Sequence, residues 1–174
     1  MYLRQANKTA RQSQELIAEG LFRLMDRKPF SRIRITELCQ EAGVGRKTFY
    51  RNFQTKEDVV EFRLDQMQQE YLAEMTPCPW EGRLRQHFTY VQQRMKVFLT
   101  LYDQGFYGRI HRKFGEVAPA FLPVGRKDQV EWEYRSQFLI EGLEALERVW
   151  VERNFQESLD QVVEMARKLT ETLV

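Results

Sequence analysis

The chain has 174 residues, of which 43% are hydrophobic, and only 5 are proline and 9 are glycine. This length is enough for one or two domains with a sizeable core, and the composition favours an ordered helical protein over a disordered one. The net charge is +2, but residues 1–56 hold 12 Lys and Arg against 5 Asp and Glu, a net of +7, and residues 57–174 hold 15 against 20. A basic first third indicates a surface for a polyanion such as nucleic acid, although a chance cluster of solvated charges would give the same counts.

Two features of the sequence predict a cytoplasmic protein. Cys39 and Cys78 do not make a disulfide framework, which fits a reducing compartment. No apolar run approaches the ~20 residues that a membrane helix needs, and the N-terminal segment lacks the apolar core of a signal peptide. We therefore expect no membrane partner.

The first predicted helix begins at Thr9 or Ser13, whose hydroxyl groups would cap it, and reaches Met25 or Asp26. Pro29 ends it, because a proline disfavours helical geometry in the residue before it. The spacing of its apolar residues is typical of a helix that buries one face. These residues are Leu16, Ile17, Leu21, Leu24 and Met25.

The segment that follows, residues 35–57 (ITELCQEAGVGRKTFYRNFQTKE), predicts a helix-turn-helix. Its first helix covers residues 35–42, and Gly43 supplies the left-handed conformation that often ends a helix. In its second helix Phe49 and Phe53, four positions apart, share a buried face. The rest of that helix carries cationic and amide side chains, which DNA recognition requires, although an ordinary helical hairpin with a solvated charged face is the alternative.

The remaining chain predicts helices throughout, and hence an all-α protein. A helix capped by Thr55 extends to about residue 75 and is broken by Pro77 and Pro79. Further helices are expected over residues 80–102, 109–116, 128–152 and from Phe155 to about residue 173.

The last two predicted helices carry apolar residues spaced by four and three, like the seam of a coiled coil. A single DNA-binding head buries too little surface for tight specific binding, so two copies on a two-fold axis are expected. The seams would then form a four-helix interface between subunits, unless they pack only within their own domain. The expected interface residues are Leu139, Leu143, Leu146, Trp150, Phe155, Leu159, Val162, Ala166 and Leu169.

The helix-turn-helix segment resembles the head of the TetR-type (TetR/AcrR-like) bacterial transcriptional regulators. The matching residues are Ala42-Gly43-Val44, Thr48-Phe49-Tyr50, Phe53 and Lys56-Glu57, with Phe30, Ile33 and Leu38 agreeing upstream. The sequence departs from the family pattern at two positions. Gly45 offers open amides but no hydroxyl to a phosphate, and Arg34 would reach a phosphate by its charge.

The resemblance and the helix geometry together predict the DNA-contacting residues. Phosphate contacts, which set the register on the duplex without reading its sequence, are expected from Arg34, Gly45, Thr48, Tyr50 and Lys56. Base contacts, typified by cationic side chains pairing with guanine O6 and N7, are expected from Arg46, Lys47, Arg51 and Asn52. For each cation, the alternative is a side chain that only faces solvent.

The resemblance also implies a ligand pocket in the body, where a packed aromatic core is the alternative. Arg109, Arg112 and His111 lie near the expected walls and would suit a small aromatic or anionic effector. The expected pocket residues are Phe88, Tyr102, Phe106, Tyr107, Trp132 and Phe138.

These observations predict two domains: a three-helix DNA-binding head, residues 1–56, and a helical-bundle body for ligand binding and dimerisation, residues 57–174. The expected function is that of a sequence-specific, ligand-responsive repressor acting as a homodimer on a palindromic operator in double-stranded DNA. An alternative is a co-activator or protein-recruiting helical module without its own small-molecule ligand. An enzyme is not expected, because no catalytic spacing is present. No metal or cofactor is expected either, because His87 and His111 lack ligand spacing.

Overall fold

The computed structural model describes residues 8–122 and 129–173, and regular secondary structure within these ranges is entirely helical. The chain divides into two compact units, Met1–Met67 (unit 1) and Gln68–Val174 (unit 2). In the described ranges, no helix combines the length and the apolar character needed to cross a membrane. The all-α fold predicted from the sequence is confirmed.

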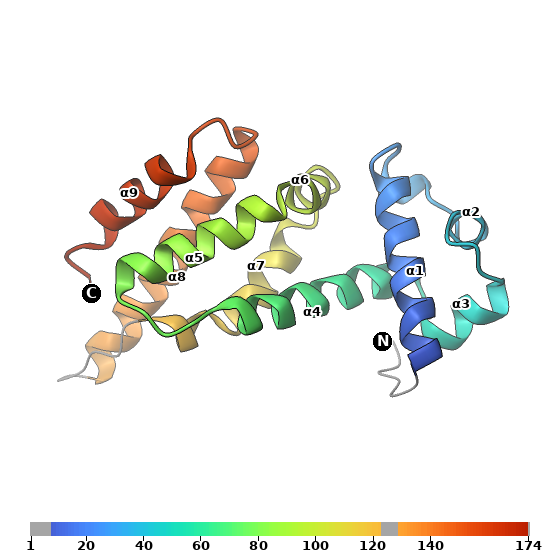
Figure 1. Cartoon of the computed structure of the whole chain (residues 1–174), viewed down its shortest axis with the longest axis horizontal. Helices are drawn as coiled ribbons and strands as arrows, with labels where there is room; N and C mark the ends of the chain where they lie inside the picture. The colour runs from blue at the N-terminus through green and yellow to red at the C-terminus, as the bar shows by residue number, and fades with distance from the viewer. Residues whose placement is uncertain (1–7, 123–128, 174) are drawn as a thin grey trace. The chain divides into compact units, whose positions relative to one another are not determined.

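Unit 1 is built around the first helix. It consists of α1 (Lys8–Met25), the short turn η1 (Phe30–Arg32), α2 (Ile35–Glu41), α3 (Arg46–Asn52) and the first part of α4 (Lys56–Glu74). α1 packs against both α2 and α3 (Figure 1). Of the apolar stripe predicted for α1, Ile17 and Leu21 are fully buried, whereas Leu16 is 41% exposed and lies outside the core.

The apolar residues at the start of α4 belong to unit 1. Val59, Val60, Leu64 and Met67 are all fully buried, so the compact core extends past the first turns of that helix. Thr55 caps α4 as predicted, because the N–H of Asp58 donates to its hydroxyl at 3.2 Å. The functional division between residues 56 and 57 remains a prediction.

Unit 2 is a helical bundle in which the last helix packs along the first. After the end of α4 it comprises α5 (Trp80–Gln93), α6 (Met95–Asp103), α7 (Tyr107–Gly115), the turn η2 (Ala118–Phe121), α8 (Gln129–Glu152) and α9 (Leu159–Thr170). α9 lies beside α5 and also packs on α8, while α6 packs on α8 (Figure 1). The buried face of α9 consists of Val162, Val163, Ala166 and Thr170.

The helix predicted over residues 80–102 is interrupted in the structure. Arg94, at φ −112° and ψ 20°, separates α5 from α6. Its guanidinium lies 3.7 Å from the centre of the Tyr90 ring and forms ion pairs with Glu70 and Glu74 on α4. No proline or glycine marks this break, so sequence pattern alone predicts one continuous helix.

The last helix begins later than predicted. Asn154 and Phe155 adopt positive φ angles of 55° and 54° and form a turn rather than the start of a helix. Ser158 then caps α9 in a reciprocal arrangement, in which its hydroxyl accepts from Gln161 N–H and the Gln161 side chain accepts from Ser158 N–H. Phe155 packs instead on Trp150, with ring centres 4.8 Å apart.

Candidate functional sites

Two glycines shape the end of α2, one in the turn that follows it and one on the neighbouring α1. Gly43 has φ +66°, and Val44 N–H after it donates to Cys39 carbonyl at 2.9 Å, which closes the C-terminus of α2. Gly20 on α1 lets α2 approach closely, because a Cβ there would lie 3.1 Å from the Ala42 side chain. The left-handed conformation at Gly43, which the sequence predicted, therefore directs the chain from α2 toward α3.

Two phenylalanines anchor α3 to the core of unit 1. Phe49 and Phe53 are 0% and 1% exposed, and their ring centres lie 6.0 Å apart. Phe53 also packs edge-on against Phe62 of α4 at 5.7 Å. These contacts confirm the predicted apolar face and leave the opposite face of α3 directed away from the core.

That opposite face carries cations without partners inside the protein. The side chains of Arg46, Lys47 and Arg51 are exposed, and none of them forms a hydrogen bond or ion pair with another described residue. Tyr50, on the same helix, is 57% exposed. Residues 42–56 contain four Lys and Arg and no Asp or Glu, so the positive charge of this segment has no carboxylate within the segment to offset it.

Several cations of α1 and the turn after it are paired with carboxylates of α2. Glu41 binds Arg23 at 2.9 Å and Arg27 at 2.6 Å, and Glu37 binds Lys28. Hydrogen bonds from Arg23 and Arg27 lower the pKa of Glu41, and a hydrogen bond from Lys28 lowers the pKa of Glu37. These carboxylates neutralise cations around α1 and α2, whereas Arg46, Lys47 and Arg51 on α3 have no such partner among the described residues.

Two predicted DNA contacts are placed differently from the sequence expectation. Asn52 is 1% exposed, and its side-chain amide donates to Thr48 carbonyl at 2.8 Å, so it is buried rather than offered to a base. The Lys56 ammonium donates to the carbonyls of Phe30 and Ile33 at 2.6 and 3.1 Å. Lys56 therefore holds together parts of unit 1 instead of projecting freely toward a phosphate.

The other predicted phosphate contacts lie at helix N-termini or on α3. Arg34 is exposed and precedes α2, Gly45 is exposed and precedes α3, and Thr48 is partly exposed in the first turn of α3. Their roles remain predictions. Arg32, at the end of η1, is a further exposed cation that sequence reasoning did not single out.

The predicted dimer seam is largely used within unit 2. Leu139, Trp150, Val162 and Ala166 are 0 to 2% exposed and face the interior of the bundle. The Trp150 N–H also donates to Glu157 carbonyl at 2.9 Å. Leu143, Leu146, Phe155 and Leu159 are partly buried. Of the predicted set, only Leu169, 63% exposed, lies fully on the surface.

A different face of the last two helices is exposed and apolar. On α8 the positions 138, 142, 145 and 149 follow one another at spacings of four, three and four. Phe138 is 66% and Val149 48% exposed, and Gly142 and Ala145 lie between them. Met165 and Leu169 on α9 are 40% and 63% exposed. An apolar seam therefore faces solvent, but on α8 each of its positions comes one residue before the predicted one.

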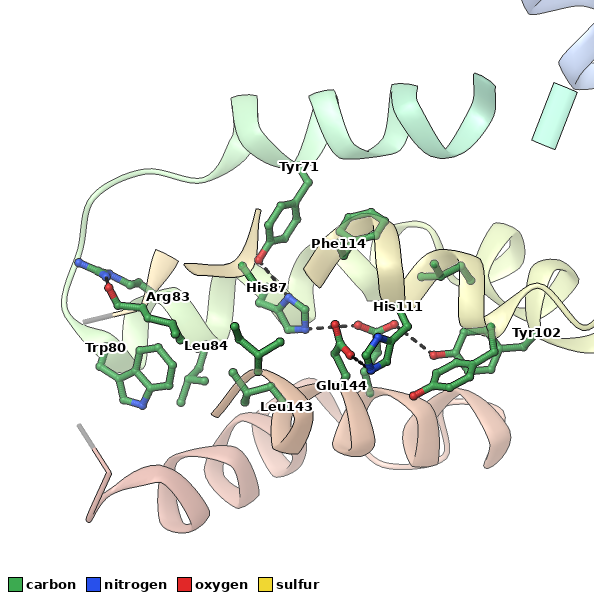
Figure 2. Close-up of a pocket in the computed structure, with 16 residues that line it drawn as sticks. Tyr71, Trp80, Arg83, Leu84, His87, Tyr102, His111, Phe114, Leu143 and Glu144 are labelled. Atoms are coloured by element: carbon green, nitrogen blue, oxygen red, sulfur yellow. Dashed lines mark hydrogen bonds and ion pairs between the residues drawn. The ribbon is translucent and has the colours of Figure 1, made fainter. Parts of the chain in front are cut away.

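The body contains a cavity with titratable walls. It has a volume of ≈ 70 Å³ and lies among α5, α6, α7, α8 and the end of α4 (Figure 2). Aromatic and aliphatic side chains make up most of the wall. Its polar and titratable members include Tyr71, His87, Tyr102, His111, Glu144 and Glu147.

Only part of the predicted pocket lines this cavity. Tyr102 and Tyr107 do, whereas Phe88 and Phe106 are buried in the core and Phe138 is exposed. Trp132 packs against the apolar cluster of Leu122, Leu139 and Ile140. Arg109 and Arg112 do not line the cavity. Sequence reasoning missed Glu144 and Glu147, although their spacing of three on one helix marks a shared face.

Comparison with known proteins assigns the fold. Residues 17–61 match the sequence model of the family described as bacterial regulatory proteins, tetR family. Among curated proteins, none matches the chain. The structure is similar to those of three solved proteins at 16–17% sequence identity.

The first of these is the dihydroxyacetone kinase operon activator DhaS, with a TM-score of 0.70, 92% of this chain and 94% of that chain covered, and 16% identity. The second is Lin0861 from Listeria innocua, with a TM-score of 0.72, coverage of 98% and 95%, and 17% identity. The third is a TetR transcriptional regulator from Rhodococcus sp. RHA1, with a TM-score of 0.57, coverage of 96% and 97%, and 16% identity.

The three-helix unit with its exposed cationic α3 has the geometry of a helix-turn-helix, and an all-helical body follows it. Unit 1 contains the segment, residues 17–61, that matches the tetR family model, and the solved structures show that the rest of the chain shares their all-helical fold.

Proposed function

We propose that this protein is a TetR-type regulator of transcription, a homodimeric, ligand-responsive repressor that binds a palindromic operator in double-stranded DNA. The observation that carries the proposal is the set of exposed, unpaired cations on α3, Arg46, Lys47 and Arg51, opposite the buried Phe49 and Phe53. A helix presented in this way fits the major groove, where such side chains pair with guanine edges. Because bacterial DNA lies in the cytoplasm, we propose that compartment as the site of action.

The exposed seam of α8 and α9 supports dimerisation. Phe138 and Val149 supply apolar contact area, and Gly142, whose added Cβ would meet nothing within 4 Å, lets a partner helix approach. Met165 and Leu169 extend the same kind of surface on α9. Two such pairs of helices from two subunits would pack as a four-helix bundle around a two-fold axis.

The cavity in unit 2 supports the ligand-responsive part of the proposal. A ligand that binds one conformation of the body more tightly than another shifts the population between them, and so alters the spacing of two heads on DNA. The free energy of this shift is limited by the difference in ligand affinity between the two states.

A second candidate function keeps the same fold but not the repression. The chain would act as an activator that recruits another protein, without a small-molecule ligand of its own. One comparison favours it, since the structurally similar DhaS is described as an operon activator.

Selection of bound fragments from a pool of random duplexes tests the proposal. A homodimer should enrich sequences with two inverted half-sites separated by about one helical turn or a related spacing. Enrichment of a single half-site would contradict the dimer, and no enrichment would contradict sequence-specific binding. With the selected site placed across a promoter, transcription in vitro should fall as protein is added, whereas a rise would favour the activator.

A further inference from the structure

We propose that the cavity of unit 2 binds a small organic cation with a compact apolar body, and that this cation is the effector. The second part rests on the proposed regulatory function, whereas the first rests on the cavity alone. A cationic ligand differs from the aromatic or anionic effector expected from the sequence.

The walls of the cavity suit a compact cation. Tyr71, Tyr102 and Phe114 line it together with aliphatic side chains (Figure 2). Aromatic ring faces attract a cation, and more strongly where water is excluded. A cavity of ≈ 70 Å³ is far smaller than the pockets that hold drug-sized ligands and suits a small ammonium compound.

Glu147 is a buried carboxyl group whose capacity for hydrogen bonds is only partly used. It is 7% exposed, and one oxygen accepts a hydrogen bond of 3.3 Å from Tyr102 hydroxyl. The other oxygen lies 3.4 Å from His87 Nε2, a buried atom that forms no hydrogen bond with the described residues. A carboxylate offers about four acceptor positions, and an incompletely paired buried charge is costly. A cation entering the cavity would offset that cost.

The surroundings of the cavity disfavour negative charge. Burial, with the charges of Glu147 and Glu141, raises the pKa of Glu144 to about 8. Burial and then Glu147 also raise the pKa values of Tyr71 and Tyr102. An anionic ligand would meet the same two penalties, whereas a cation would be stabilised by Glu147 and would favour ionisation of Glu144.

The arginine that lines the cavity is already bound to the backbone. Arg83 donates to the carbonyls of Cys78 and Leu122, both at 2.9 Å. It is the only Lys or Arg among the described lining residues. Arg148 lies 5.5 Å from the centre of the Tyr107 ring and is not part of the lining. The wall therefore presents carboxyl groups to a ligand without a free guanidinium to receive an anion.

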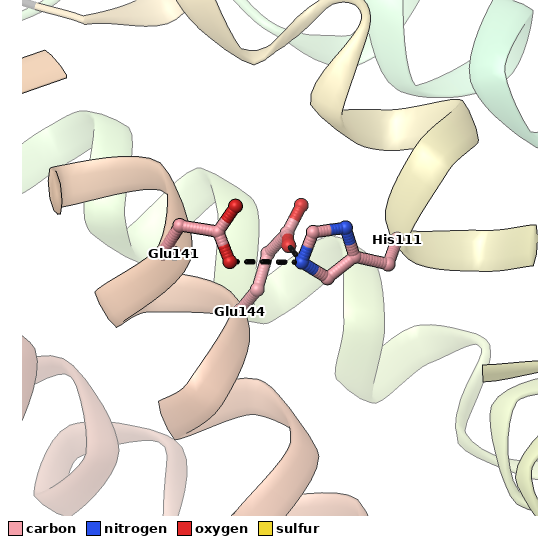
Figure 3. Close-up of side chains that lie close together, drawn as sticks. All are labelled: His111, Glu141 and Glu144. Carbon is pink, nitrogen blue, oxygen red and sulfur yellow. Dashed lines mark hydrogen bonds and ion pairs between the residues drawn. The ribbon is translucent and has the colours of Figure 1, made fainter. Parts of the chain in front are cut away.

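A metal ion is the competing occupant. One ligand atom each from His111, Glu141 and Glu144 lies within 4.8 Å of the other two (Figure 3). The His111 Nε2 already lies 3.1 Å from Glu141 and also contacts Glu144, so an N–H at that position accounts for the cluster. Glu141 is 52% exposed and does not line the cavity. A substitution at Glu141 should therefore affect a bound metal ion but not an organic cation in the cavity.

The test uses three probes that share a tert-butyl body and differ in charge. They are 3,3-dimethylbutylammonium, 3,3-dimethylbutan-1-ol and the 3,3-dimethylbutanoate anion. Binding to the full chain is measured by calorimetry at pH 7 without DNA. We expect a Kd below about 1 mM for the ammonium, affinity at least about tenfold lower for the alcohol, and no detectable binding of the anion. Equal affinity for alcohol and ammonium, tighter binding of the anion, or no binding of the ammonium overturns the proposal.

Matched variants locate the site. Glu147→Gln should weaken the ammonium at least about tenfold and leave the alcohol within about twofold, while Glu141→Gln should change neither. If Zn²⁺ or Mn²⁺ alone stabilises the chain, the ammonium does not, and Glu141→Gln abolishes the metal effect, the cluster is a metal site and the organic cation is wrong.

The regulatory part is measured separately, as the change in DNA affinity when the ammonium saturates the cavity. We expect a drop of about fivefold or more. Cation binding with unchanged DNA affinity would retain the cavity assignment and overturn the effector role.

Discussion

The Lys56 ammonium donates a 2.6 Å hydrogen bond to the carbonyl oxygen of Phe30, 26 positions earlier in the chain. It also donates to Ile33 carbonyl at 3.1 Å and lies 4.3 Å from the centre of the Phe30 ring. These contacts hold η1, which leads into α2, against the start of α4. The motif residue that resemblance assigned to a phosphate is therefore bound within unit 1.

Lys56→Met keeps most of the aliphatic stem and removes the donors. Because two carbonyls in a partly buried environment lose a charged partner, we expect the free energy of unfolding to fall by about 1–3 kcal/mol. Urea denaturation followed by circular dichroism measures this. Lys47→Met, at an exposed position without a described partner, is the control and should change stability by no more than about 0.5 kcal/mol. If Lys56→Met leaves stability unchanged but reduces the salt dependence of DNA binding, Lys56 contacts a phosphate after all.

Alanine at Arg46, Lys47 or Arg51 should change which sequence is preferred. A side chain that contacts a base edge contributes about 1–3 kcal/mol of discrimination, so affinity for the selected site should fall by roughly five- to 150-fold with less effect on random DNA. Competition binding with single-base variants of the site measures this. Arg11→Ala is the matched control, since Arg11 is exposed on α1 and pairs with Glu15 at 3.2 Å. Equal losses on every sequence would assign these residues to phosphates instead.

Gly142→Arg should produce a folded monomer. A Cβ at Gly142 meets nothing within 4 Å in the single chain, so the substitution fits the fold, but its side chain would occupy the space of a partner helix. Sedimentation velocity at micromolar concentration should show about half the wild-type mass. Glu133→Arg introduces the same residue at an exposed position of α8 away from the seam, and should leave the mass unchanged. A dimeric Gly142→Arg protein would place the interface elsewhere.

Glu144 should make stability depend on pH. Its pKa is raised from 4.5 to about 8 in the folded chain, so the folded state keeps a proton that the unfolded state releases. The stability contributed by this neutral carboxyl is present below about pH 4.5 and is lost as the pH rises through about 8. Glu141 and Glu147 on α8 and His111 on α7 face the same group.

Glu144→Gln removes this titration. Its melting temperature should therefore exceed that of the wild type by more at pH 8.5 than at pH 5, as measured by differential scanning calorimetry. Glu133→Gln, an exposed position outside the cavity, should show no such difference. If the two melting temperatures differ by the same amount at pH 5 and at pH 8.5, Glu144 is ionised in the folded chain throughout this pH range.

The sequence predicted the parts of the fold that depend on local pattern. The left-handed Gly43, the buried pair Phe49 and Phe53 and the cap at Thr55 each follow from residue type and spacing. The break at Arg94 was missed because it depends on ion pairs to Glu70 and Glu74 from another helix. The late start of α9 was missed although Ser158 and Gln161 carry a capping pattern.

The sites were predicted less completely, because amphipathic spacing does not say which core a face joins. Residues such as Trp150 and Ala166 were assigned to a partner subunit but are buried within their own unit. Asn52 was assigned to a base because it lies on the recognition helix, but it follows the buried Phe49 by three positions and so falls on the same, inward face. The carboxyls of the cavity were missed because tertiary packing alone brings Glu144 and Glu147 to the histidines of α5 and α7.

The most direct test is a fluorescence-anisotropy titration of the selected duplex at several salt concentrations. Wild type is compared with the variant that carries Arg46→Ala, Lys47→Ala and Arg51→Ala together. We predict that the logarithm of the wild-type affinity falls linearly and steeply with the logarithm of salt concentration, and that the triple variant binds at least about a hundredfold more weakly with a shallower slope. Wild-type binding that is absent or insensitive to salt, or a triple variant that binds like wild type, would contradict the presentation of α3 to DNA.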